Sequence, residues 1–151
     1  MKIITKSKED YIKAIYHLEK ELNKPVKSIE LVHYLKISKP SVSEMIKKLA
    51  KADLLSYKAY TKLNLTKKGI KEAEKITYKH RVIEMFLTKI LKLDSSLIHE
   101  EGNRLEHAFS DQAIDKICAL LKHPKFCPHG KPIPKIKTEL KMKNKNQIRK
   151  R

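Results

Sequence analysis

Residues 36–50, which read KISKPSVSEMIKKLA, carry the strongest fold signal in this chain. Ser38 is a good N-cap, and Pro40 falls in the first helical turn, where its missing N–H costs little. Apolar residues then recur at helical spacing and form an inward-facing stripe: Val42, Met45, Ile46 and Leu49. The stretch therefore predicts a helix that is capped by Ser38 and packs one side on a core.

Two further helices are expected before this one. Ser7 is a good N-cap with Asp10 three residues later, close to a capping box. Apolar residues follow at helical spacing: Ile12, Ile15, Tyr16, Leu18 and Leu22. Pro25 ends that segment, and Ser28 can cap a short helix whose inward residues are Ile29, Val32 and Leu35. Because residues 36–38 then form a tight turn, the second and third helices have the helix-turn-helix shape.

A β-hairpin is expected directly after the helix-turn-helix. Residues 54–58 and 63–66 are two short alternating runs, and a polar turn at residues 59–62 separates them. A hairpin in this position is the wing of a winged helix. Thr66 then caps a long helix with an expected break or bend near Tyr78. Its apolar side is Ile70, Ala73, Ile76, Ile83, Phe86, Leu87 and Leu91.

The basic excess of the chain points to a polyanionic partner. The 151 residues contain 35 Lys and Arg against 17 Asp and Glu, a formal net charge of +18. Residues 1–77 carry +9, residues 78–134 carry +2, and residues 135–151 carry +7. This excess favours double-stranded DNA as the partner, although a generally Lys-rich proteome is an alternative explanation. The last segment is expected to be a flexible basic tail that either attracts phosphates or only keeps the chain in solution.

The outward face of the third helix and the hairpin supply the candidate DNA contacts. Hydroxyl groups near a helix N-terminus can approach phosphates closely, and lysines further along add positive charge. Glu44 can accept from a cytosine amine or repel a wrong register. The solvated face of an ordinary amphipathic helix is the alternative. The candidates are Ser38, Lys39, Pro40, Ser41, Ser43, Glu44, Lys47 and Lys48 on the helix, and Lys58, Tyr60 and Lys62 on the hairpin.

Composition excludes several other classes of protein. Three glycines and no glycine-rich motif exclude the common nucleotide-binding enzymes. No window approaches the roughly 18 uninterrupted apolar residues of a spanning helix, and residues 1–10 lack the apolar stretch of a secretory signal. Two cysteines, Cys118 and Cys127, are too few for a disulfide framework. We therefore expect a cytoplasmic protein that is not an enzyme.

The middle of the chain holds side chains suited to a divalent cation. They are His80 and Glu84 on the long helix, and His99, Asn103, Glu106 and His107 on a helix that Ser96 opens. The spacing within each set places it on one helix face, where imidazoles and carboxylates can surround a metal ion. For any single histidine, a structural hydrogen bond is the alternative. Residues 103–107 approach the H-x-x-E-H motif of inverted zinc proteases, but Asn at position 103 removes one imidazole, so a hydrolase is a poor interpretation.

In sequence order, the motif-bearing stretches resemble the diphtheria toxin repressor family, including its manganese-transport-regulator branch. The stretches are residues 7–16, 38–43, 79–81, 99–101, 105–111 and 128–134. Members of this family are metal-dependent transcriptional repressors, and the resemblance covers residues 5–134. It implies a mainly α fold with an N-terminal winged helix-turn-helix and an all-helical dimerisation and metal-binding domain. The expected form has two domains, without the SH3-like third domain of longer members.

The resemblance also implies two metal sites. The primary site would use Asp10, Asn103, Glu106 and His107, and the ancillary site would use His80, Glu84 and His99. In some members the Cys-Pro-His-Gly segment supplies ligands, which makes Cys127 and His129 candidates; inert packing of the thiol is the alternative. Asn103 stands where the family usually has Cys or Glu, and Lys13 stands where manganese-selective members carry a second carboxylate. We expect Mn²⁺, narrowly over Fe²⁺, with Zn²⁺, Co²⁺ or Ni²⁺ binding in vitro.

These observations combine into one functional prediction. Residues 1–72 would bind DNA, and residues 73–134 would bind metal and form a homodimer. A divalent cation would bridge the two domains and set the recognition helices of the dimer on a palindromic operator of metal-uptake genes. Two alternatives stay open: a winged-helix regulator that has lost metal control, and a basic protein that coats DNA without sequence preference.

Overall fold

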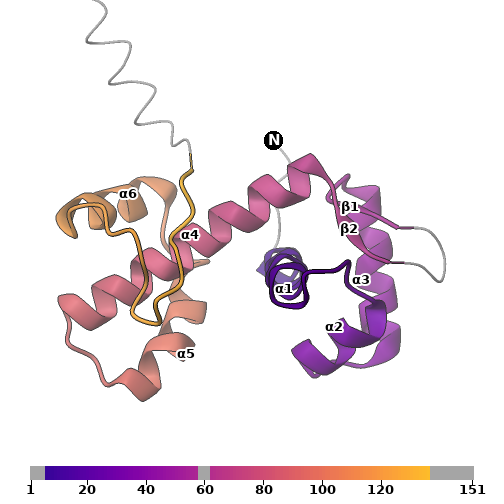
Figure 1. Cartoon of the computed structure of the whole chain (residues 1–151), viewed down its shortest axis with the longest axis horizontal. Helices are drawn as coiled ribbons and strands as arrows, with labels where there is room; N and C mark the ends of the chain where they lie inside the picture. Colours follow the sequence, from indigo (N-terminus) through magenta and orange to yellow (C-terminus); the bar gives the residue numbers. More distant parts are fainter. Residues whose placement is uncertain (1–5, 58–61, 137–151) are drawn as a thin grey trace, which may run out of the picture. The chain divides into compact units, whose positions relative to one another are not determined.

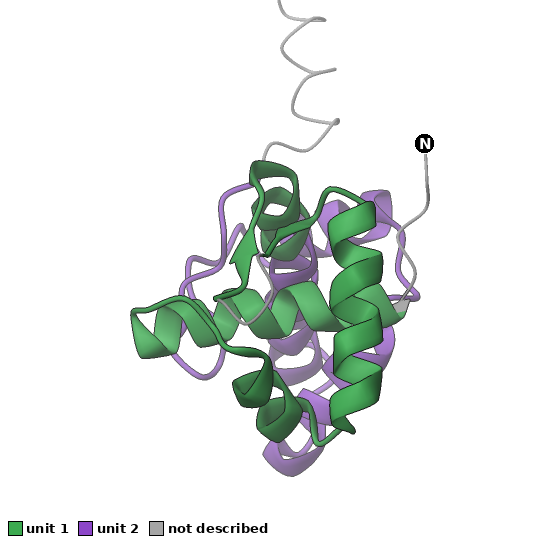
Figure 2. Cartoon of the chain, turned by 90° about the vertical axis from the view of Figure 1, so that its right-hand side faces the viewer, with its two compact units in different colours: residues 1–74 green, residues 75–151 purple. Residues whose placement is uncertain are grey.

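A computed structural model of the chain describes residues 6–57 and 62–136 (Figure 1). Its described residues form six helices and one two-stranded sheet, which confirms the mainly α prediction. The chain divides into two compact units, Met1–Glu74 and Lys75–Arg151, with the boundary inside one helix (Figure 2). Lys58, Tyr60 and the basic tail from residue 137 onward lie outside the described residues.

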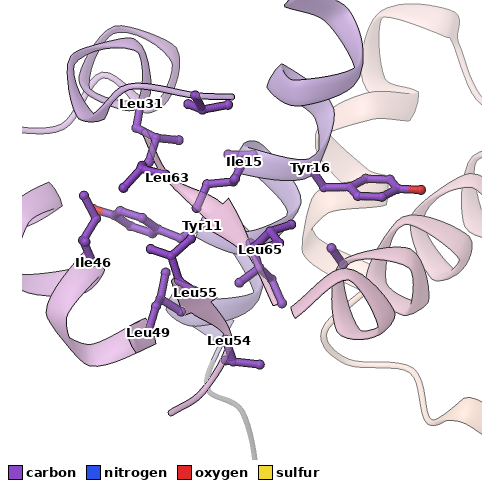
Figure 3. Packing of buried hydrophobic residues seen from close by; sticks show 14 of the residues in the cluster. Tyr11, Ile15, Tyr16, Leu31, Ile46, Leu49, Leu54, Leu55, Leu63 and Leu65 are labelled. Atoms are coloured by element: carbon purple, nitrogen blue, oxygen red, sulfur yellow. The ribbon is translucent and has the colours of Figure 1, made fainter. Parts of the chain in front are cut away.

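The first unit is a winged helix. It contains helices α1 (Lys6–Leu22), α2 (Ser28–Leu35) and α3 (Lys39–Lys51), strands β1 (Leu55–Ser56) and β2 (Asn64–Leu65), and the first turns of α4 (Lys67–Lys89). The strands are antiparallel and pair Leu55 with Leu65, as the alternating pattern predicts. Figure 3 shows part of the unit's core, where Tyr11 and Ile15 of α1 lie among side chains from α2, α3, the two strands and the residues next to the strands: Leu31, Ile46, Leu49, Leu54, Leu55, Leu63 and Leu65.

Local capping sets most helix starts in the first unit. Ser38 caps α3 and accepts from the Ser41 N–H at 3.4 Å, and Thr66 accepts from the Gly69 N–H at 3.0 Å at the start of α4. Both confirm the sequence prediction. Two other caps were wrong: Ser7 lies inside α1, and Ser28 is the first residue of α2.

Glycine is required where α4 crosses the hairpin. A Cβ on Gly69 would lie 2.0 Å from the carbonyl oxygen of Leu54, far inside van der Waals contact. The main chain of α4 therefore approaches the residue before β1 at a distance that any side chain would prevent. This close packing ties the last helix of the first unit to the hairpin.

The second unit is all-helical and packs around the remainder of α4. In Figure 1, α5 (Ser95–Leu105) and α6 (Asp111–Leu120) lie on either side of it. Two predictions need correction. Helix α4 continues through Tyr78 without a break, since Tyr78 packs into the core and donates to Asp115. Asp94, not Ser96, caps α5. Helix α6, capped by Ser110, was not predicted at all. The core residues are Tyr78, Val82, Ile83, Leu87, Ile98, Ile114, Cys118 and Ile133.

A loop at residues 124–134 closes the second unit. Phe126 and Pro132 form an isolated antiparallel bridge, and the Ile133 N–H donates to the Lys125 carbonyl at 2.8 Å. Gly130, with φ of +74°, makes the turn between them. Ile133 is buried in the core, so the loop is anchored at its base and carries Cys127 on its inner side. Among the described residues, every helix is too short or too polar to cross a lipid bilayer.

Candidate metal centre

A buried carboxylate, Glu84 on α4, lies at the centre of the candidate metal site. Its Oε1 atom is approached by three imidazole nitrogens: His80 Nε2 at 3.0 Å, His99 Nδ1 at 3.4 Å and His129 Nδ1 at 3.5 Å. Helix α4 places His80 one turn before Glu84, α5 contributes His99, and the loop at residues 124–134 contributes His129. The site therefore brings together three segments of the second unit.

The charge of Glu84 is maintained by its histidine neighbours. Burial, which leaves the residue 2% exposed, raises the pKa of the carboxyl group. Hydrogen bonds from His80 and His99 and the charges of His80 and His129 outweigh burial and lower the pKa of Glu84 to about 2. The side chain is thus an anion at neutral pH, as a metal ligand must be.

Two overlapping sets of donors share Glu84. His80, Glu84 and His99 form one set, and Glu84, Cys127 and His129 form the other; within each, the donor atoms lie within 4.8 Å of one another. Imidazole nitrogen, carboxylate oxygen and thiolate sulfur are donors that Zn²⁺, Fe²⁺ and Co²⁺ accept, while Mn²⁺ prefers oxygen and nitrogen. The sequence prediction named Cys127 and His129 as candidates without assigning them to either site, and the fold places them beside the same carboxylate as His80 and His99.

A second carboxylate, Glu106, lies against the other side of His80. His80 Nδ1 is 2.5 Å from Glu106 Oε2, and Glu106 Oε1 is 3.3 Å from His107 Nε2. Glu106 is completely buried. Helix α5 ends at Leu105, and Glu106 and His107 follow it. Glu106 caps the helix with helical backbone angles, and its N–H donates to the Gly102 carbonyl at 3.0 Å, so the predicted helical register from His99 continues to Glu106 and only His107 lies beyond it.

The residues of the predicted primary site come from both units. Asp10 lies partly buried on α1 in the first unit, as does Lys13 one turn later. Asn103 lies partly buried on α5, and Glu106 and His107 follow it in the second unit.

Two residues that sequence reasoning missed shape the centre. Gly102 on α5 faces α4, and a Cβ there would lie 3.2 Å from His80 Cε1 and 3.4 Å from Glu84 Cγ. The absence of a side chain lets α5 approach the His80–Glu84 pair closely. Arg81 on α4 donates through its guanidinium to the carbonyl of Pro132 and so holds the loop that carries Cys127. Neither role has a local sequence signal, because each depends on a segment distant in the chain.

The exposed face of α3 is the candidate DNA-binding surface. All eight predicted residues, from Ser38 to Lys48, are exposed, while Val42, Ile46 and Leu49 are buried on the opposite face. Glu44 and Lys48 form an ion pair of 2.6 Å one turn apart, so each neutralises part of the other's charge. Lys62 of the hairpin is also exposed.

Comparison with known proteins gives one match in each half of the chain. Residues 4–63 match the N-terminal DNA-binding domain of the iron-dependent repressors, and residues 66–135 match their metal-binding and dimerisation domain. Over 114 residues, 41% are identical to an HTH-type transcriptional regulator of Methanocaldococcus jannaschii, an alignment that covers 76% of this chain and 91% of the relative.

Two longer proteins are also similar to this chain. The diphtheria toxin repressor of Corynebacterium diphtheriae is 32% identical over 134 residues, which cover 89% of this chain and 59% of that repressor. A manganese-dependent transcriptional repressor solved in complex with manganese is 33% identical, with a TM-score of 0.79 over 85% of this chain and 58% of the other. The chain thus spans somewhat under two thirds of either protein. With both domains matched in order and a close relative covered almost completely, this chain belongs to the iron-dependent repressor family of metal-dependent transcriptional regulators.

Proposed function

We propose that this protein is a DNA-binding repressor that responds to a divalent metal ion, Mn²⁺ or Fe²⁺, and controls genes for uptake of that metal. The observation that carries the proposal is the buried Glu84 carboxylate with three imidazole nitrogens and a thiol around it, in a chain whose other unit is a winged helix. Glu84 is already ionised at neutral pH, so it can bind a cation without first losing a proton.

Two groups of residues are proposed to hold metal. His80, Glu84 and His99, joined by Cys127 and His129, form the ancillary group; Asp10, Asn103, Glu106 and His107 form the primary group. A bound divalent cation would supply positive charge that offsets the repulsion among these carboxylates. Because Asp10 belongs to residues 1–72 and its partners to residues 73–134, metal binding is proposed to fix one domain against the other.

The DNA contacts are proposed on α3 and the hairpin. Ser38, Ser41 and Ser43 offer hydroxyls near the helix N-terminus, where backbone N–H groups also favour phosphate. Lys47 and Lys48 add positive charge, and Lys58, Tyr60 and Lys62 would contact the backbone from the wing. A homodimer places two such helices on a palindromic operator, with half-sites separated by about one helical turn or a multiple of it.

The remaining parts of the proposal follow from this role. The protein acts by binding rather than by catalysis, and it works in the cytoplasm, where it meets its operator. The basic residues after position 135 add sequence-independent attraction to DNA, whose strength falls as salt concentration rises.

Operator binding tests the proposal. Binding to a palindromic promoter fragment is measured at fixed salt with Mn²⁺, with Fe²⁺ under anaerobic conditions, and with EDTA. We expect tight, sequence-specific binding only with metal. Equal affinity in EDTA and in metal would overturn the metal dependence, and equal affinity for operator and unrelated DNA would favour the non-specific alternative.

A matched pair of variants separates metal control from its loss. His107→Ala removes a proposed primary ligand, whereas His123→Ala removes an exposed histidine elsewhere in the same unit. We expect only the first to weaken operator binding in metal. If His107→Ala binds DNA as the unmodified chain does, the protein is a winged-helix regulator without metal control.

A further inference from the structure

The turn that carries Glu106 and His107 is attached to α4 through Lys79. The ammonium group of Lys79 donates to the main-chain carbonyl of Phe109 at 3.1 Å and forms an ion pair with Asp111 Oδ1 at 2.8 Å. The Lys79 side chain is only 15% exposed, so the cation lies within the packed unit and not in solvent. Both contacts are charge-assisted, which makes them stronger than hydrogen bonds between neutral groups.

The next residue of α4 holds the same turn at its other end. His80 Nδ1 lies 2.5 Å from Glu106 Oε2, and Glu106 is completely buried. Two consecutive residues of one helix therefore contact the turn, His80 through the side chain at position 106 and Lys79 through the main chain at position 109. His107 lies between these two points of attachment.

The main chain of the turn is also joined to α5. The N–H groups of Ala108 and Phe109 both donate to the Leu105 carbonyl at 3.0 Å. The Phe109 carbonyl instead accepts from Lys79 on α4. The turn is thus tied to α5 by its N–H groups and to α4 by a carbonyl, and Lys79 supplies the donor for the second connection.

We propose that Lys79 is a positioning residue for the primary group: by fixing the turn of residues 106–109 on α4, it holds Glu106 and His107 in the arrangement that a divalent cation requires. The inference rests on the proposed function, since the primary group must bind metal. Lys79 does not ligate the ion, because an ammonium group has donors but no acceptor. Its effect precedes metal binding: a turn that is already held loses less conformational freedom when the ion binds, and the affinity is higher.

Mn²⁺ binding to the full chain tests the proposal. A background of His99→Ala with Cys127→Ser removes two donors of the ancillary group and leaves the primary group intact. The electron paramagnetic resonance signal of free Mn²⁺ then gives the affinity. Lys79→Met keeps the aliphatic stem and removes the ammonium group. In this background we expect it to weaken Mn²⁺ binding about 10-fold or more, the size of effect seen when a residue that orients a metal ligand is lost.

Three further variants separate positioning from a general loss of charge or stability. Lys75→Met removes the other ion pair of Asp111, which joins Lys75 Nζ to Asp111 Oδ2 at 2.5 Å. Because the Lys75 side chain is 40% exposed, this variant should change the Mn²⁺ affinity little. Lys79→Arg keeps the positive charge and should restore most of the affinity. Lys79→Gln, which is one atom shorter and uncharged, should lose affinity as Lys79→Met does.

The proposal is overturned if Lys79→Met binds Mn²⁺ as the background does, if Lys75→Met loses as much affinity, or if Lys79→Arg restores none. Operator binding adds a second readout in the chain with both groups intact. Lys79→Met should raise the Mn²⁺ concentration for half-maximal binding and leave the operator affinity at saturating Mn²⁺ unchanged. A lower affinity at saturation would show a general structural role instead and would overturn the proposal.

The outcomes also separate this inference from the proposed function. Operator binding that is equal with and without metal would overturn the proposed function, while a weaker Mn²⁺ affinity of Lys79→Met would still support the role of Lys79. Metal-dependent operator binding with an unchanged Mn²⁺ affinity in Lys79→Met would overturn only this inference. A chain that binds no Mn²⁺, Fe²⁺ or Zn²⁺ would overturn both.

Discussion

The guanidinium of Arg81 donates to the main-chain carbonyl of Pro132, 51 positions later in the chain. This contact joins α4 to the loop at residues 124–134, whose inner side carries Cys127 and whose turn carries His129. Because Glu84 lies on the same helix as Arg81, one helix provides both the central carboxylate and the anchor of the loop that brings two further donors to it.

Removing this anchor should loosen the loop. Arg81→Ala deletes a charge-assisted hydrogen bond, and we expect the free energy of unfolding of the second unit to fall by about 1–2 kcal/mol. The affinity for Co²⁺ should also fall, since Cys127 and His129 would no longer be held near Glu84. Calorimetry and Co²⁺ titration measure the two effects. Arg104→Ala is the matched control: Arg104 is half-exposed or more on α5, where it pairs with Glu100 and Glu101, and its removal should change either quantity little.

The two cysteines provide an internal comparison for the metal centre. Cys127 lies with Glu84 and His129, whereas Cys118 packs in the core and lies 3.5 Å from His123 Nδ1. With Co²⁺ bound, a thiolate ligand produces a near-ultraviolet charge-transfer band. We expect Cys127→Ser to abolish this band and Cys118→Ser to preserve it. A band that survives Cys127→Ser would identify the Cys127 thiol as packing only.

The second unit should lose stability in acid, because the carboxyl group of Asp111 stabilises it only while ionised. Burial raises the pKa of this carboxyl group, but hydrogen bonds and charge from Lys75 and Lys79 outweigh burial, so the net shift is downward. A carboxyl group whose pKa is lower when folded stabilises the fold above its unfolded pKa of about 3.9 and loses that contribution as pH falls through the folded pKa.

The size of the Asp111 effect is limited by solvent. The side chain is 52% exposed, so we expect less than about 1 kcal/mol. Denaturant unfolding of the unmodified chain and of Asp111→Asn should differ at pH 6 and converge near pH 2. A difference that stays constant over this range would mean that the stabilisation does not depend on the carboxylate charge.

Lys47 on α3 should contribute to DNA affinity through charge. If its ammonium group contacts a phosphate, Lys47→Ala should weaken binding to operator and unrelated DNA alike. The slope of log affinity against log salt should decrease by about 0.9, the value for one phosphate contact. Lys116→Ala removes an exposed lysine of α6 and serves as the control. A loss confined to the operator would instead assign Lys47 to base recognition.

Glu44→Gln tests the neighbouring ion pair. Glu44 holds Lys48 at 2.6 Å in the free protein, and hydrogen bonding and charge from Lys48 lower the pKa of the Glu44 carboxyl group. Removing the negative charge should increase the affinity for unrelated DNA and reduce the preference for the operator. Competition binding at fixed salt measures that preference. An unchanged ratio would show that the Glu44 charge takes no part in discrimination.

Local signals in the sequence were sufficient for most of the first unit. The cap at Ser38, the cap at Thr66 and the apolar stripe of α3 depend on residues within a few positions of one another, and all three were confirmed. The prediction of a helix cap was wrong where two candidate capping residues lie close together in the sequence. At α5, Asp94 and Ser96 are two positions apart, and only the folded backbone decides that the Asp94 carboxylate accepts from the Ser96 N–H.

The identities of the candidate ligands could be inferred from the order of residues along the chain, but their grouping could not. His80 and Glu84 share a face of α4 because they are four residues apart. The contact between His80 and Glu106 spans 26 positions and exists because α5 ends at Leu105 and packs against α4 through Gly102. Sequence spacing governs neighbours within a helix, whereas the packing of α4, α5 and the C-terminal loop decides which donors share one carboxylate.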